Sequence, residues 1–166
     1  MKGGGLVKKT VIIAIIAVVI VVAIVGVIFV NLNKEKNSIT ASSFYTTMSQ
    51  KGYSVQDASR QFSKYNYVKQ AYIAISQDYS YQIEFYELLD DSYATSFYNN
   101  NKSIFEASKG NASAETRVAF KNYSKYTLSS NGKYMVVSRI NNTVIYVDVD
   151  NSYKDTVEAL LDELGY

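Results

Sequence analysis

The chain has 166 residues and a formal net charge of +2, which suits one domain of ordinary size. It contains no Cys, His, Trp or Pro. The missing Cys and His exclude disulfides, thiol nucleophiles, imidazole bases and the usual zinc and haem ligands. We therefore expect no cofactor, and any hydrolytic chemistry would need carboxylates, a Ser–Lys pair or a metal held by oxygen ligands.

Charge is distributed unevenly along the chain. Residues 1–36 contain five Lys and one Glu and so carry a net charge of +4, whereas residues 37–166 carry −2. The basic character of the whole chain therefore belongs to its N-terminal region. We predict no nucleic-acid partner, because the larger part of the chain is slightly acidic.

An uninterrupted apolar segment runs from Val11 to Val30 and contains no polar side chain. As a helix, its 20 residues would span about 30 Å, the thickness of a bilayer hydrocarbon core. Fifteen of them are β-branched, but in lipid a helix is the one conformation that pairs every backbone group within a single segment. The segment predicts one transmembrane helix that contacts the lipid bilayer.

The apolar segment is predicted to be retained as a signal anchor, with a cleaved signal peptide as the alternative. A secretory apolar region is about 7–15 residues long and ends at a small-residue cleavage site, and residues 28–33 offer no such site. Lys2, Lys8 and Lys9 precede the segment, so the positive-inside rule places the N-terminus in the cytoplasm. The predicted parts are a cytoplasmic stub (1–10), a signal anchor (11–30), a spacer (31–38) and an extracytoplasmic domain (39–166).

Three helices are predicted in the outer domain. The first covers 40–51, with Ser38 or Thr40 as its cap and Gly52 as its stop. The second begins at Asp90-Asp91-Ser92 and continues to about Ala107, and the third covers 153–164 after a cap at 150–152. The apolar members of the second helix are Tyr93, Phe97, Ile104 and Phe105. Residues 55–65 are predicted to be a short helix or an irregular crossing.

Five strands are predicted, at 67–76, 81–89, 117–130, 133–140 and 143–149. Asn131-Gly132 is a strong signal for a two-residue hairpin, and Asn141-Asn142 favours a second one. The expected fold is α+β, with one antiparallel sheet of about five strands and helices packed mainly on one face. It contains two hairpin–helix units, at 66–108 and 115–166.

Paired carboxylates are the chemistry that the composition leaves open, since a glycosidase needs two facing carboxyl groups about 5–9.5 Å apart. Such pairs occur at Asp90/Asp91, Glu84/Glu87 and Asp148/Asp150. Asp90 and Asp91 lie at a predicted helix start, where carboxylates stabilise free N–H groups. The segment Asp148–Ser152 imitates an EF-hand opening, but Tyr153 and Ala159 stand where Gly and Glu belong. We predict no catalytic residue and no metal site, and the chain is not expected to be an enzyme.

All 16 Tyr lie in the outer domain. Strand alternation predicts a core face formed by Ile73, Ile75, Ile83, Phe85, Val137, Ile145 and Val147. Tyr72, Tyr86, Tyr134 and Tyr146 would then lie on the opposite face as a platform for a protein, a glycan or a second copy, because tyrosine suits interfaces. The alternative is that residues 39–65 cover this face.

The sequence predicts a membrane-anchored extracytoplasmic binding module. Its composition, rich in Asn, Lys, Ile and Tyr, is typical of a bacterium of low GC content. The expected role is an accessory or sensor-like subunit of a bacterial envelope complex, with another envelope protein as partner. The alternative is a cell-wall polymer-binding or carboxylate-dependent hydrolytic domain. The oligomeric state stays open.

Overall fold

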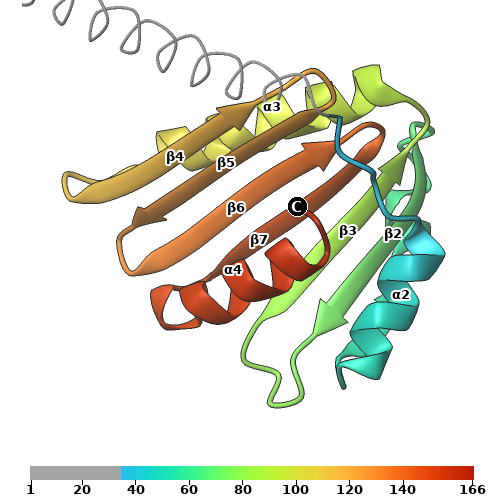
Figure 1. The fold of residues 1–166 in the computed structure, drawn as a ribbon, viewed down its shortest axis with the longest axis horizontal. Helices are drawn as coiled ribbons and strands as arrows, with labels where there is room; N and C mark the ends of the chain where they lie inside the picture. The colour runs from blue at the N-terminus through green and yellow to red at the C-terminus, as the bar shows by residue number, and fades with distance from the viewer. Residues whose placement is uncertain (1–34) are drawn as a thin grey trace, which may run out of the picture. The chain divides into compact units, whose positions relative to one another are not determined.

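A seven-stranded antiparallel sheet forms the centre of the structure, a computed structural model that describes residues 35–166 (Figure 1). The strand order is β1-β2-β3-β7-β6-β5-β4. The predicted α+β class is confirmed, but the prediction of five strands is wrong. The predicted stub and signal anchor lie outside the described residues. Within residues 35–166, no helix combines the length and the apolar character needed to cross a bilayer.

The sheet consists of β1–β3 and the meander β4–β7, which meet where β3 pairs with β7. Their bounds are β1 (Ser54–Asp57), β2 (Val68–Ile75), β3 (Gln82–Leu88), β4 (Ser113–Ala119), β5 (Tyr123–Ser130), β6 (Lys133–Ile140) and β7 (Thr143–Asp150). The two predicted hairpin–helix units therefore join edge to edge in one continuous sheet.

Two strands were missed because their local signals are weak. β1 is a polar four-residue edge strand in the segment predicted as a helix or crossing. The predicted strand 117–130 is interrupted by a turn at 120–122, in which the Phe120 N–H donates to the Tyr123 carbonyl at 2.7 Å. This turn contains no Gly, and the Asn122 carbonyl accepts from the distant Asn141 N–H at 2.8 Å.

The helices are α2 (Ala41–Gln50), α3 (Asp91–Ala107) and α4 (Lys154–Glu163), with short 3₁₀ helices η1 (Ser59–Phe62) and η2 (Asn151–Tyr153). Thr40 caps α2 by accepting from the Ser43 N–H at 3.1 Å. Asp90 caps α3 by accepting from two N–H groups. The predicted cap at 150–152 is wrong, since η2 precedes α4 and the Asp150 side chain makes no capping bond.

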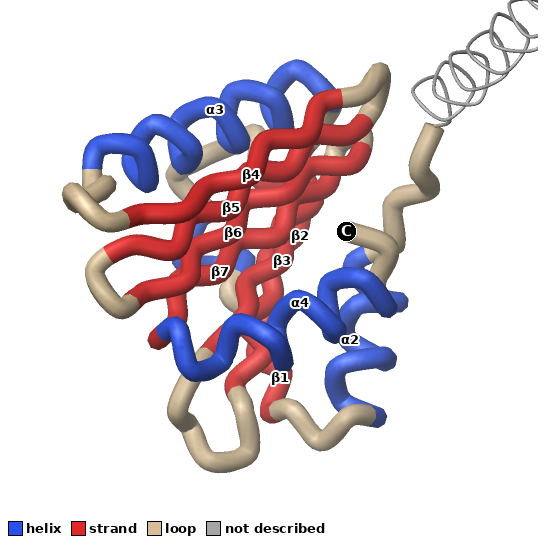
Figure 2. Tube along the Cα trace, turned by 60° about the vertical axis from the view of Figure 1, so that its left-hand side comes forward, coloured by secondary structure: helices blue, strands red, loops and turns tan. Residues whose placement is uncertain are grey.

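The helices cover both faces of the sheet, which corrects the prediction of one covered face. α2 and α4 pack on one face and α3 on the other (Figures 1 and 2). The reason lies in the central strands: β6 directs Tyr134, Val136 and Ile140 to one face of the sheet and Met135 and Val137 to the other. A sheet that is apolar on both sides has to be covered on both sides.

Two hydrophobic cores lie on opposite sides of the sheet. On the α2/α4 face, Phe44 of α2 stacks on Phe85 of β3 with ring centroids 4.8 Å apart, and both side chains are fully buried. On the α3 face, Phe105 packs over the sheet with Tyr126 and Val137. Each helix is thus held by its own set of large apolar side chains.

The first described residues are bonded to the domain. Asn122 accepts from the Lys36 N–H at 3.1 Å and donates to the Lys36 carbonyl at 2.7 Å. The Lys36 ammonium donates to the Gly165 carbonyl at 2.9 Å, and Glu35 pairs with Lys121. The C-terminal half of the predicted spacer is therefore in contact with the β4–β5 turn and the end of α4.

Candidate binding groove

The four tyrosines predicted to form one platform lie on two different faces. Tyr72 and Tyr134 belong to the α2/α4 core, whereas Tyr86 and Tyr146 belong to the α3 core. The prediction that they share a face is therefore wrong.

Strand register explains this separation. In the β2–β3 hairpin Tyr72 lies opposite Phe85, and in the β6–β7 hairpin Val137 lies opposite Tyr146. Directly opposed residues point to the same face, so a one-residue error in register moves a whole strand to the other side. For the same reason the predicted core face is divided: Ile73 and Val137 pack on the α3 face, and Phe85 packs on the other.

Each of the four tyrosines connects the sheet to the elements around it. Tyr72 packs against Tyr45 of α2 with ring centroids 5.5 Å apart, and Tyr146 packs against Phe105 of α3 at 5.2 Å. The Tyr134 hydroxyl donates to Glu158 of α4 at 3.0 Å, and Tyr86 packs against Phe97 of α3 with ring centroids 4.7 Å apart. Burial raises the pKa of Tyr146 to about 12.

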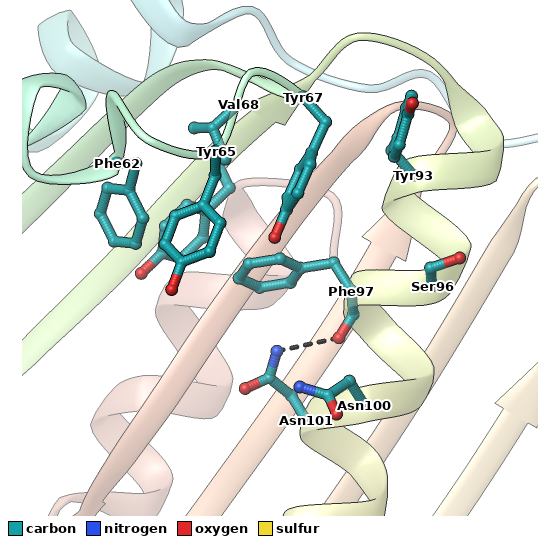
Figure 3. Close-up of a pocket in the computed structure, with 10 residues that line it drawn as sticks. Phe62, Tyr65, Tyr67, Val68, Tyr93, Ser96, Phe97, Asn100 and Asn101 are labelled. Atoms are coloured by element: carbon teal, nitrogen blue, oxygen red, sulfur yellow. Dashed lines mark hydrogen bonds between the residues drawn. The ribbon is translucent and has the colours of Figure 1, made fainter.

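An open groove lies on the α3 face, between the segment 62–68 and the first half of α3 (Figure 3). Its volume is about 670 Å³, within the range of roughly 300–1,000 Å³ that small-ligand sites occupy. The lining residues are Phe62, Tyr65, Tyr67, Val68, Tyr86, Tyr93, Ser96, Phe97, Asn100 and Asn101. We call this the aromatic groove.

Six aromatic rings form a connected series along the aromatic groove. The Tyr93 and Tyr67 rings are stacked, with centroids 5.3 Å apart and an interplanar angle of 10°, and Tyr65 follows 5.7 Å from Tyr67. Tyr86 contacts Phe97 at 4.7 Å and Phe62 at 5.3 Å. Tyr86 is buried, whereas Tyr65 and Tyr93 are 40% and 42% exposed. The series therefore has a buried floor and an accessible rim.

Amide side chains supply the polar wall. Asn100 and Asn101 project from α3 below Phe97 (Figure 3). The Asn101 Nδ2 donates to the Phe97 carbonyl at 2.8 Å, which fixes the amide and leaves its Oδ1 as an acceptor. None of the ten described lining residues carries a formal charge.

Local structure holds both walls in place. Tyr93, Phe97 and Asn101 are spaced four residues apart, so they share one face of α3. Asp90 fixes the start of that helix and accepts from the Tyr93 N–H at 3.0 Å. The opposite wall is held by the Tyr67 carbonyl, which accepts from the Leu89 N–H at 2.9 Å.

From the sequence, Tyr93 and Phe97 are predicted only as apolar members of a helix. The four-residue spacing of Tyr93, Phe97 and Asn101 was a signal that two aromatic rings and one amide lie on the same face of the helix. The second signal was the aromatic run Phe62, Tyr65 and Tyr67 in a segment with no clear secondary structure. The sequence could not show that these two segments face each other.

The candidate carboxylates lie elsewhere. Two further grooves, of about 190 and 400 Å³, each contain a single carboxylate, Asp148 in the first and Asp78 in the second. The aromatic groove contains none. Glu87 pairs with Lys69 at 2.9 Å. Among residues 35–166, no three Asp or Glu side chains gather as metal ligands would.

No protein-family model matches this sequence, and searches of curated proteins and of solved structures find no similar protein. The class of residues 35–166 therefore rests on their structure alone. They form an α+β domain whose seven-stranded antiparallel sheet is covered on both faces and carries an uncharged aromatic groove.

Proposed function

We propose that the chain is a single-pass membrane protein whose residues 35–166 form an extracytoplasmic binding module. The observation that carries this proposal is the aromatic groove, an accessible ring-lined site. The apolar segment 11–30 and the Lys residues before it support the anchor and its orientation. The module would serve as an accessory or sensor-like subunit in a bacterial envelope.

Binding is proposed rather than catalysis because of the chemistry of the groove. Its lining consists of aromatic rings, two amides, one serine hydroxyl and one valine, and it includes no carboxylate, ammonium or guanidinium group. General acid–base catalysis needs a group with a pKa near the working pH, within hydrogen-bond reach of the reacting atoms. The rings and amides favour recognition, which supports a polymer-binding role over a hydrolytic one.

The absence of Cys from the sequence allows a direct test of location. Tyr79, which is 78% exposed, is replaced in a Tyr79→Cys variant, and Lys2 in a matched Lys2→Cys variant. In intact cells a membrane-impermeant maleimide should label Tyr79→Cys alone, and permeabilised cells should label both. Labelling of Lys2→Cys alone in intact cells would contradict the proposed orientation.

The groove itself is tested by tyrosine footprinting. Tyr65 and Tyr93 should be iodinated readily in the purified chain and be protected in native envelopes, where the ligand is present. Tyr79 lies outside the groove and should react equally in both preparations. Equal iodination of Tyr65 and Tyr93 in both preparations would show that the groove is empty in the envelope and refute its role.

A further inference from the structure

The rim of the aromatic groove has two accessible rings, Tyr65 and Tyr93, which are 40% and 42% exposed. Tyr67 lies between them, stacked on Tyr93 at a centroid distance of 5.3 Å and 5.7 Å from Tyr65. Phe97 reaches from α3 toward Tyr65 and Tyr67 (Figure 3). Aromatic rings offer flat apolar faces, and tyrosine adds a hydroxyl at the wet end. This surface suits a ligand with flat C–H faces and a polar edge.

The polar groups of the groove match hydroxyl groups rather than a hydrocarbon. Asn101 presents a fixed amide oxygen, and Asn100 has an exposed amide that both donates and accepts. A sugar hydroxyl also donates and accepts, so it pairs with either end of an amide. An aliphatic ligand would desolvate these groups without pairing them, which is unfavourable.

The charge of the groove argues against an ionic ligand. The described lining residues carry no formal charge. Lys64 lies beside the groove, with its Nζ 5.1 Å from the centroid of the Tyr65 ring, but it is not a lining residue. A phosphate or carboxylate in the groove would lose water without gaining a bonded cation.

We infer that the aromatic groove binds an uncharged polysaccharide strand, with its sugar rings packed on the accessible rings of Tyr65 and Tyr93 and its hydroxyls bonded to Asn100 and Asn101. This inference rests on the proposed binding function and names the ligand class. The groove is open to solvent at its rim, so a strand can lie across it without a free chain end.

Calorimetry on the full chain in lipid nanodiscs tests the inference. The probes are neutral chito-oligosaccharides and cello-oligosaccharides of increasing length, with heparin oligosaccharides as charged comparators. Binding should tighten with the length of at least one neutral series and be absent for heparin. Tyr65→Ala and Tyr93→Ala should each weaken binding about tenfold, the scale of one lost ring contact.

The variants are chosen to separate binding from folding. Asn100→Ala alters an exposed side chain and should weaken binding while circular dichroism stays unchanged. Tyr79→Ala lies outside the groove and should bind as the parent does. Absence of binding to both neutral series overturns the inference, and so does unchanged binding by Tyr65→Ala and Tyr93→Ala.

The two proposals can fail separately. If Tyr65 and Tyr93 are protected in envelopes but neither neutral series binds, the binding function stands and the polysaccharide assignment is refuted. If protection and oligosaccharide binding are both absent, both proposals are refuted.

Discussion

Tyrosine takes the place of tryptophan as the largest core side chain of this protein. Tyr126, Tyr134 and Tyr166 are among its fully buried residues, and each hydroxyl has a partner. Thr143 Oγ1 donates to the Ile140 carbonyl at 2.7 Å, so the Tyr166 hydroxyl donates to Thr143. Buried phenols keep their hydrogen bonds only while they are protonated.

Alkaline pH should therefore unfold the domain. Burial raises the pKa of Tyr126 and of Tyr146 to about 12, above the ordinary value of about 10. A raised folded-state pKa means that the native state holds the proton more tightly. The resulting stability is fully present below about pH 10 and is lost as pH rises toward and past 12.

This alkaline transition is followed by phenolate absorbance and circular dichroism. Tyr126 and Tyr146 should ionise together with a cooperative loss of dichroism. A single titration near pH 10 with unchanged dichroism would contradict the prediction.

At the scale of single elements, the turns with a strong local sequence signal were predicted correctly, and the turn with a weak signal was missed. Asn131 and Gly132 have φ of 53° and 76°, so both have the positive φ that a type I′ hairpin requires. The turn at 120–122 has no such signature and depends on Asn122, which bonds to Lys36 and Asn141. Such long-range bonds leave no local pattern in the sequence.

Substitutions of two aspartates test which predicted helix caps stabilise the domain. Asp90→Ala should destabilise the domain by about 1 kcal/mol, because two N–H groups at the start of α3 lose their acceptor. Asp150→Ala is the matched control: Asp150 makes no capping bond and meets Lys133 at 3.5 Å in an exposed pair. Urea denaturation should show a loss below about 0.5 kcal/mol for this control. Equal losses for the two variants would refute the distinction.

At the scale of the whole molecule, the sheet separates two cores, whereas the sequence predicted a single core on one face. The available signal was β6, in which four apolar residues follow one another from Tyr134 to Val137 instead of alternating with polar ones. The groove was beyond prediction for a different reason. Its walls, at 62–68 and 93–101, are distant in sequence and meet only after α3 packs across the sheet.

Separate cores should behave independently under mutation. Phe44→Leu and Phe105→Leu alter opposite faces, so their destabilisations, about 1–2 kcal/mol each, should add within about 0.5 kcal/mol. Phe44→Leu and Phe85→Leu alter one stacked pair and should deviate from additivity by about 0.5–1.5 kcal/mol. Double-mutant cycles in urea measure both. Strong coupling between Phe44 and Phe105 would contradict the separation.

The bonds of Lys36 also decide how the domain carries a mechanical load. A pull that enters through the N-terminal segment reaches Lys36 before it reaches α2, because Lys36 comes first in the chain. Asn122 and Gly165 hold Lys36, so the tension passes to the β4–β5 turn and the end of α4. These bonds must therefore break before a pull on the N-terminal segment can separate α2 from the sheet.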